Sequence, residues 1–408
     1  MRKPLFILVI FMILTSMVWP CSSAVVSGRS TPDGRPLIWK HRDARDEEND
    51  LRYFEGEKYS FIGLVNTKDE KGEQVWMGGN SEGFCIMNTN AYNLDKAGYD
   101  GPMDQDGYFM KEALGKCANL QDLEKLLDEK QGKLGVIACF GAIDAQGGAA
   151  YYETSPFKYV KYNAADSRQA PSGYLIRTNF GFSGKMDRGS GYIRYRTLTD
   201  LFFRESVKNK ITAEFLVLDA TRCLEHTVLK TNLRKGELPG EAGESELQIF
   251  RDYIVRGGSV SSMIARGVKP GEDPLLTTLW YIPAFQLSSP VVPVWAGAGK
   301  ELPEAAVSRN GEPSFISEKA LSLKSQILPL PGWEGRNYID LPMILNQQGN
   351  GILQELIPQD RMTLSRSLDL VNDWKKNGFK PSQAADFYDR VDERIREFYK
   401  NIESNFAK

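Results

Sequence analysis

Cys21 directly follows an apolar leader in the sequence. If processing made it the new N-terminus, it would carry two reactive groups, a thiol and an α-amine. A thiol with a pKa of about 8.5 is a good nucleophile once deprotonated, and an α-amine with a pKa of about 7.7–8.0 is a usable base near neutral pH. Nucleophile and base would then lie on one residue, without any histidine. The commoner fate of an exported cysteine is a buried thiol or half of a disulfide, so downstream residues must decide between these roles.

The leader has the pattern of a secretory signal. Arg2 and Lys3 form a basic start, and residues 4–19 are an almost unbroken apolar run that is short for a membrane span. We therefore expect residues 1–20 to be removed and the mature protein to be exported to a periplasm or secreted. No second run in the chain approaches membrane length, so we expect no integral span after processing.

The cleavage position stays open on the sequence alone. Cuts after Ser16 or Ala24 place a small residue at the junction, but the first leaves a stub before Cys21 and the second deletes it. A lipoprotein signal also ends at a cysteine, and lipidation of Cys21 would make the protein a lipid-anchored binding protein. We favour this less, because Trp19 and Pro20 replace the small residues of such a signal.

Composition excludes several classes of function. The 408 residues carry 51 Lys plus Arg and 53 Asp plus Glu, so there is no basic field and nucleic-acid binding is not expected. The only histidines are His41 and His226, which excludes a multi-histidine metal centre and leaves few candidates for a histidine-based triad. A dyad of Cys21 with His226 ranks below self-activation, since no motif surrounds His226. We expect neither metal nor cofactor.

Residue periodicity predicts an α+β chain in which strands are interrupted by blocks of helices. A turn at residues 31–34 should join the first two strands into a hairpin. Two long amphipathic helices should follow Gly351 and break near Gly378 and Pro381. Strands are expected at 22–28, 36–40, 60–65, 74–78, 84–88, 136–144, 149–153, 174–179, 259–265 and 275–282, and helices at 120–130, 192–205, 212–222 and 244–255.

The segments 21–24, 32–34 and 40–43 together resemble the opening of the linear-amide hydrolases of the N-terminal-nucleophile (Ntn) superfamily. These include the choloylglycine hydrolases (bile-salt hydrolases and penicillin V acylases) and the acyl-CoA:6-aminopenicillanic acid acyltransferases. In such enzymes a leading cysteine is followed by a strand, a turn with glycine and a second strand that ends near an aspartate. Asp43 matches this aspartate, which holds the α-amine and the nucleophile. Lys40 takes the place of an arginine beside the thiol.

Two later segments extend the resemblance, although His41 departs from it by replacing an asparagine. Residues 79–88 look like the family's N-E-x-G-L…L-N hairpin, which puts Asn88 at the oxyanion side, with Asn90 as a close competitor. Residues 177–180 look like the T-N segment, in which Asn179 would polarise the scissile carbonyl.

Arg194 is the candidate active-site arginine, because residues 191–195 are similar to the family's S-S-R-F segment. Arg188 and Arg196 are nearby competitors. Amide side chains are suited to stabilising an oxyanion, an aspartate can orient the amine, and Lys40 and Arg194 can favour a thiolate by proximity.

The resemblance implies an Ntn αββα four-layer sandwich with a C-terminal helical extension. The expected domains are a leader over 1–20, a catalytic domain over 21–300 and a mostly helical extension over 301–408 that packs on it. The implied function is a cysteine amidase that hydrolyses linear N-acyl amides through a Cys21 acyl-enzyme; the alternative is an acyltransferase. The expected partner is a small-molecule N-acyl amide, and homo-oligomers are common in the family.

Two further groups of residues stay open. The four remaining cysteines, Cys85, Cys117, Cys139 and Cys223, could form disulfides in an oxidising compartment. Cys85 and Cys139 lie in apolar strand-like stretches, which favours buried thiols for these two. Several aromatic residues near the candidate segments could line an acyl pocket, but most of them are expected in the core; they are Trp76, Phe84, Phe140, Phe180 and Phe182.

Overall fold

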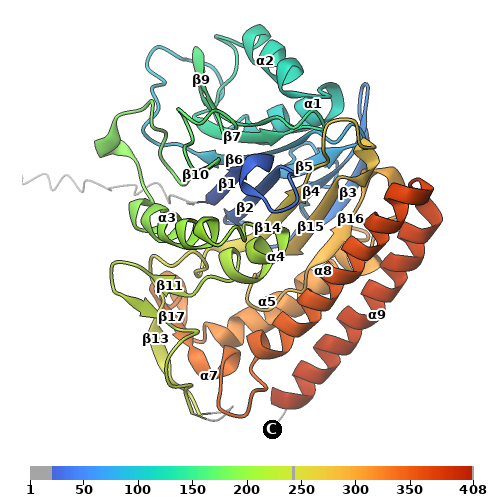
Figure 1. Ribbon diagram of the computed structural model, residues 1–408. Helices are drawn as coiled ribbons and strands as arrows, with labels where there is room; N and C mark the ends of the chain where they lie inside the picture. The colour runs from blue at the N-terminus through green and yellow to red at the C-terminus, as the bar shows by residue number, and fades with distance from the viewer. Residues whose placement is uncertain (1–20, 241–243, 407–408) are drawn as a thin grey trace, which may run out of the picture.

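Two antiparallel sheets organise the computed structural model, which describes residues 21–240 and 244–406 (Figure 1). The expected leader over 1–20 lies outside these residues. The mixed class of helices and sheets is confirmed. The six-stranded sheet has the order β10 (Tyr174–Arg177), β1 (Ser22–Val26), β2 (Leu37–Asp43), β14 (Ser259–Arg266), β15 (Thr278–Pro283) and β16 (Val292–Val294). The seven-stranded sheet runs in chain order: β3 (Asn49–Glu55), β4 (Ser60–Asn66), β5 (Met77–Asn80), β6 (Cys85–Asn90), β7 (Ala138–Ile143), β8 (Ala149–Ser155) and β9 (Lys158–Asn163).

Alternate residues of these strands point into different parts of the core, as the two-residue period of a strand requires. Met263 and Tyr281 of the six-stranded sheet share one buried cluster with Met87 of the seven-stranded sheet, so this cluster fills the space between the sheets. The neighbouring Trp280 faces the other way, into a second cluster. Ile86 likewise faces away from Met87, into a third cluster on the outer side of the seven-stranded sheet.

Helices supply the rest of the two outer clusters. The second cluster contains residues of α3 (Tyr192–Val207), α4 (Ala213–Phe215) and α8 (Ile352–Asn377), and the third contains α1 (Asp106–Lys116) and α2 (Leu120–Glu129). Figure 1 shows α1 and α2 above the sheets and α3 and α4 below them. The remaining helices are α5 (Phe315–Ile327), α6 (Gly332–Gly335), α7 (Leu341–Ile344) and α9 (Pro381–Phe406).

The first hairpin is the element that positions the candidate site. β1 pairs antiparallel with β2, with Ser22 opposite His41 and Ser23 opposite Lys40, which confirms the predicted hairpin. Gly34 in the turn has φ +73°, a left-handed conformation that glycine adopts without strain. Because the two strands run in opposite directions, the start of β1 lies beside the end of β2.

The helix predicted over 244–255 is wrong. The described part of this segment forms β13 (Leu247–Ile249), which pairs with β17 (Tyr338–Asp340), and then irregular backbone with Asp252 at φ 63°. Its apolar residues are packed by distant parts of the chain, with Phe250 fully buried. Another two-stranded pair joins β11 (Glu225–His226) and β12 (Thr231–Asn232). Tertiary pairing therefore overrides the local helical pattern.

Other elements shift or were missed. The helix expected over 212–222 divides into α4 and a π-helical turn over Leu216–Ala220, and the strand expected over 74–78 lies instead at β5. No strand or helix was expected at β3, β9, β16, α1 or α5.

The two long C-terminal helices form as predicted and turn at Gly378, where φ is +78°. They lie side by side along the β16 edge of the six-stranded sheet (Figure 1). Trp295 contacts Trp374 of α8 edge-on, with ring centroids 4.9 Å apart, and stacks on Tyr388 of α9 at 5.9 Å. Aromatic contacts of this kind contribute beyond the area they bury. No helix among the described residues is both long and apolar enough to cross a membrane.

A buried ion pair fastens α8 to the rest of the fold. Asp360 pairs with Arg222, whose guanidinium also donates to the Ser289 carbonyl at 3.1 Å, and the backbone N–H of Val291 donates to the Asp360 carboxylate at 2.9 Å. Both charged side chains are fully buried.

We predict that Asp360→Ala lowers the free energy of unfolding by about 3–5 kcal/mol, because it leaves the Arg222 charge buried without its partner. Asp369→Ala, at an exposed position of the same helix, is the matched control and should change stability by less than about 0.5 kcal/mol. Urea unfolding followed by circular dichroism measures both. Equal effects of the two substitutions would contradict this role of the ion pair.

Candidate active site

Cys21 precedes the first residue of β1 and is 8% exposed. Its thiol lies 3.8 Å from the backbone carbonyl oxygen of Asp43, at the end of β2. The residue lines a pocket of about 460 Å³, here called the cysteine pocket, together with Lys40, Asp43 and Asn88. The structure thus brings four of the six predicted site residues to one cavity.

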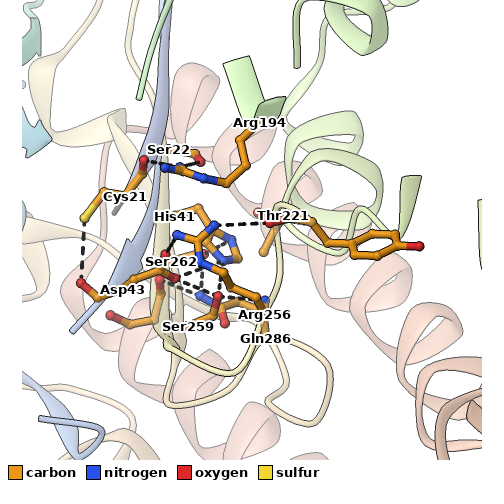
Figure 2. Close-up of polar contacts among 12 residues, drawn as sticks. Cys21, Ser22, His41, Asp43, Arg194, Thr221, Arg256, Ser259, Ser262 and Gln286 are labelled. Carbon is orange, nitrogen blue, oxygen red and sulfur yellow. Dashed lines mark hydrogen bonds and ion pairs between the residues drawn. The ribbon is translucent and has the colours of Figure 1, made fainter. Parts of the chain in front are cut away.

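Of the other two, Arg194 contacts the Cys21 backbone and Asn179 contacts Arg194. Arg194 is the third residue of α3, and its guanidinium donates to the Cys21 carbonyl oxygen at 2.5 Å and to Ser22 Oγ at 2.7 Å (Figure 2). It also donates to Asn179 Oδ1 at 2.8 Å. Asn179 Nδ2 donates to the Asn90 carbonyl at 3.0 Å. Neither Arg194 nor Asn179 is among the described residues that line the cysteine pocket, whereas Asn90 is.

Lys40, Asn88 and Asp106 form a hydrogen-bonded chain along one side of the cysteine pocket. Lys40 Nζ donates to Asn88 Oδ1 at 2.6 Å, and Asn88 Nδ2 donates to Asp106 Oδ1 at 3.0 Å. Burial lowers the pKa of Lys40 to about 7, and burial raises the pKa of Asp106 to about 6. One N–H of the Asn88 amide is therefore already engaged, and the other remains to donate.

Asp43 lies in a compact polar cluster under the thiol (Figure 2). Its carboxylate accepts a hydrogen bond from Ser259 Oγ at 2.7 Å and pairs with Arg256. His41 Nε2 is 2.8 Å from Ser259 Oγ and 3.8 Å from the carboxylate. Burial and the nearby positive charges of Arg256 and Arg194 hold the pKa of His41 well below its usual range, so this histidine is neutral at pH 7.

Three residues of this neighbourhood were missed from the sequence. Arg256 follows the segment that was misread as a helix, and Asp106 opens a helix that was not expected. Arg42 lines the pocket and donates to Asn49 Oδ1 at 2.6 Å and Asn66 Oδ1 at 3.0 Å, with its guanidinium 4.7 Å from the Trp76 ring centroid. The position of Arg42 between Lys40 and Asp43 was the one feature of the sequence that could have indicated its place in the site.

The site is rich in buried positive charge. Lys40, Arg42 and Arg194 are 1%, 4% and 2% exposed, and none forms an ion pair with a carboxylate of residues 21–240 or 244–406. Burying a cation without a counter-ion is costly unless an anion is supplied.

The remaining candidates lie elsewhere. Arg188 and Arg196 are exposed, and His226 Nδ1 accepts from the backbone N–H of Leu229 at 3.1 Å without lining the described cysteine pocket. Of the aromatic residues considered, Trp76 lines the pocket; Phe84 and Phe140 belong to the outer core of the seven-stranded sheet, Phe180 is buried, and Phe182 covers Arg177.

All five cysteines are buried free thiols, which answers the open question of pairing. Burial raises the pKa of Cys117 and Cys223 to about 12, and it raises the pKa of Cys85 and Cys139 further still. Across the described chain, no group of three or more His, Cys, Asp and Glu side chains is arranged to hold a metal ion.

No protein-family model and no curated protein sequence matches the chain. Among solved structures it is similar to penicillin V acylase from Agrobacterium tumefaciens, with 13% identity and a TM-score of 0.40, over 68% of this chain and 86% of the acylase. It is also similar to a variant of the conjugated bile acid hydrolase from Clostridium perfringens, with 9% identity and a TM-score of 0.39, over 68% of this chain and 93% of the hydrolase. The Caenorhabditis elegans ortholog of N-acylethanolamine-hydrolyzing acid amidase is similar with 15% identity and a TM-score of 0.31, over 47% of this chain and 86% of the amidase.

Proposed function

We propose that the chain is a cysteine Ntn amidase that hydrolyses linear N-acyl amides, with Cys21 as nucleophile. The observation that carries the proposal is the position of this thiol: it precedes β1, lines a pocket, and has around it three buried basic side chains, none of which forms a close ion pair within the described residues. Such an environment stabilises an anion at the point where nucleophilic attack on an amide creates one. The neighbouring structures agree with an amide hydrolase in general.

The first half of the reaction forms an acyl-enzyme. With residues 1–20 removed, the Cys21 α-amine takes the proton of its own thiol, and the sulfur attacks the amide carbonyl carbon to form a tetrahedral oxyanion. Collapse of this intermediate breaks the C–N bond. The α-ammonium returns its proton to the leaving amine, and a thioester remains on Cys21. Water, deprotonated by the α-amine, then attacks the thioester and releases the carboxylic acid and the thiol.

The surrounding residues have separate roles in this scheme. The Asp43 carboxylate, held by Arg256 and Ser259, still has acceptor capacity for the α-ammonium of Cys21. Asn88 has one amide N–H engaged, which leaves the second for the oxyanion, whereas Asn179 does not line the described cysteine pocket and acts together with Arg194. Arg194 acts through the Cys21 carbonyl and Asn179, so it is a positioning residue rather than a catalytic one.

We also propose that the fold is the αββα sandwich of Ntn hydrolases. The two sheets, with α1 and α2 on one outer face and α3, α4 and α8 on the other, support this assignment. Residues 301–408 are then an addition whose helices pack along the β16 edge. Removal of the leader by export would both place the enzyme outside the cytoplasm and release the α-amine that the mechanism needs.

We predict that the purified enzyme begins at Cys21 and that Cys21→Ala abolishes acyl-amide turnover, by more than about a thousand-fold in kcat. Cys117→Ala, which removes a different buried thiol, is the matched control and should retain turnover. Intact mass spectrometry establishes the N-terminus of each protein, and a panel of N-acyl amides gives the rates. A fully active Cys21→Ala enzyme would end the proposal.

A second prediction uses the pKa of Lys40, which burial lowers to about 7. The ammonium charge of Lys40 is present below this pH and is lost as the pH rises through it. Lys40 therefore supports a Cys21 thiolate only below about pH 7. Lys40→Met should slow alkylation of Cys21 by iodoacetamide about ten-fold at pH 6 and have little effect at pH 9. Lys40→Arg keeps the charge and should react as fast as wild type at pH 6 and faster at pH 9. The same rate ratio at both pH values would refute this role.

A further inference from the structure

A second pocket, also of about 460 Å³, adjoins the cysteine pocket. Tyr92 lines both cavities, and the segment that carries it is tied to the candidate site: the Tyr92 backbone N–H donates to the Asn179 carbonyl at 3.3 Å. From there residues 92–96 continue along the second pocket. Tyr92 therefore lies between the two cavities, and a ligand whose amide bond lies at Cys21 would have to pass this residue to reach the second one.

The second pocket is lined by four cations that converge from three segments. Lys96 comes from the loop after β6, Lys158 begins β9, and Lys185 and Arg188 come from the loop before α3. All four are exposed, and none forms an ion pair with a carboxylate in the part of the chain that the structure describes. In a protein whose net charge is −2, this is a local excess of mobile positive charge.

One of the two carboxylates of the second pocket, Glu153, is compensated by an ion pair. Glu153 is 2% exposed and accepts hydrogen bonds from Arg177 Nε at 2.8 Å, from the Phe182 backbone N–H at 2.8 Å, and from Ser183 N–H and Oγ at 2.7 and 2.6 Å. Arg177 compensates the charge of Glu153, and the donor groups of Phe182 and Ser183 bind its carboxylate oxygens. The other, Asp95, is exposed and accepts from the Ala97 backbone N–H at 2.9 Å; it keeps its charge, and the four cations outnumber it. The four cations therefore keep their capacity for an external anion.

We infer that this second pocket binds an anionic oxygen group, a carboxylate, sulfate or phosphate, at the far end of the substrate whose amide is attacked by Cys21. The inference rests on the proposed function for the amide and adds the chemical class of the remote group. Recognition by several exposed cations gives modest energy per contact, strong dependence on ionic strength, and preference for anionic over neutral substrates.

The test uses pairs of amides that differ only in one charge. Glutaryl-p-nitroanilide is compared with its neutral primary amide, which places the anion on the acyl side; N-butyryl-4-aminobenzoate is compared with N-butyryl-4-aminobenzamide, which places it on the amine side. At least one anionic member should have the higher kcat/KM. Lys158→Gln/Arg188→Gln should raise its KM about five-fold with little change in kcat. Lys210→Gln/Arg366→Gln removes the same charge from exposed sites elsewhere and should leave KM unchanged.

A binding measurement separates failure of this inference from failure of the amidase proposal. Glutarate and 4-aminobenzoate contain no acyl-amide bond, and glutaramide and 4-aminobenzamide are their neutral counterparts. By calorimetry, at least one of the two anions should bind the full-length wild-type protein more tightly than its counterpart, and Lys158→Gln/Arg188→Gln should weaken that binding about five-fold. Such binding without amide turnover would refute the amidase and keep the anion site. Equal affinity for anion and counterpart, or for wild type and variant, would overturn the anion site.

Discussion

The register of β2 between its two neighbours is the constraint on which the candidate site depends. On one side β1 pairs with Ser22 opposite His41, which brings Cys21 to the end of β2. On the other side β14 pairs with Ser259 opposite Asp43, across a local irregularity. Side chains alternate between the faces of a sheet, so a one-residue slip of β1 against β2 would put the Cys21 thiol on the face opposite Lys40, and a slip of β14 would turn Ser259 away from Asp43. The hairpin turn and the buried apolar residues of both faces oppose such a slip.

Electrostatics then explains why so polar a cluster persists in the interior. Lys40 donates to Asn88, Arg42 to Asn49, and Arg194 to the Cys21 carbonyl. These acceptors are carbonyl and amide oxygens, and the carboxylates of Asp106 and Asp46 act on Lys40 and Arg42 without forming an ion pair with them. Fully apolar substitutes would be less costly for stability. The arrangement is coherent if the compensating anion is transient, as a thiolate and an oxyanion are. Asp43 differs, because Arg256 compensates its charge and leaves it as a fixed acceptor.

Part of this site was predictable because it is local in sequence. Cys21, Lys40 and Asp43 share one hairpin whose turn is evident, and Asn88, Asn179 and Arg194 sit in segments that resemble known motifs. Arg256 and Asp106 were not found, since their approach to Cys21 depends on β14 and α1 packing against strands far away in the chain. The helix wrongly expected over 244–255 has the same cause: β13 gains a partner, β17, that lies about ninety residues further on. Local periodicity contains no information about such a partner.

Trapping of the acyl-enzyme tests the central claim most directly. The purified protein is mixed with a slowly hydrolysed N-acyl amide, quenched with acid and digested, and its peptides are weighed. The account predicts that the acyl mass appears on the peptide that begins at Cys21 and that hydroxylamine removes it, as expected for a thioester. Turnover accompanied by an acyl group on any other residue, or by an unmodified N-terminal peptide that still begins before Cys21, would contradict it.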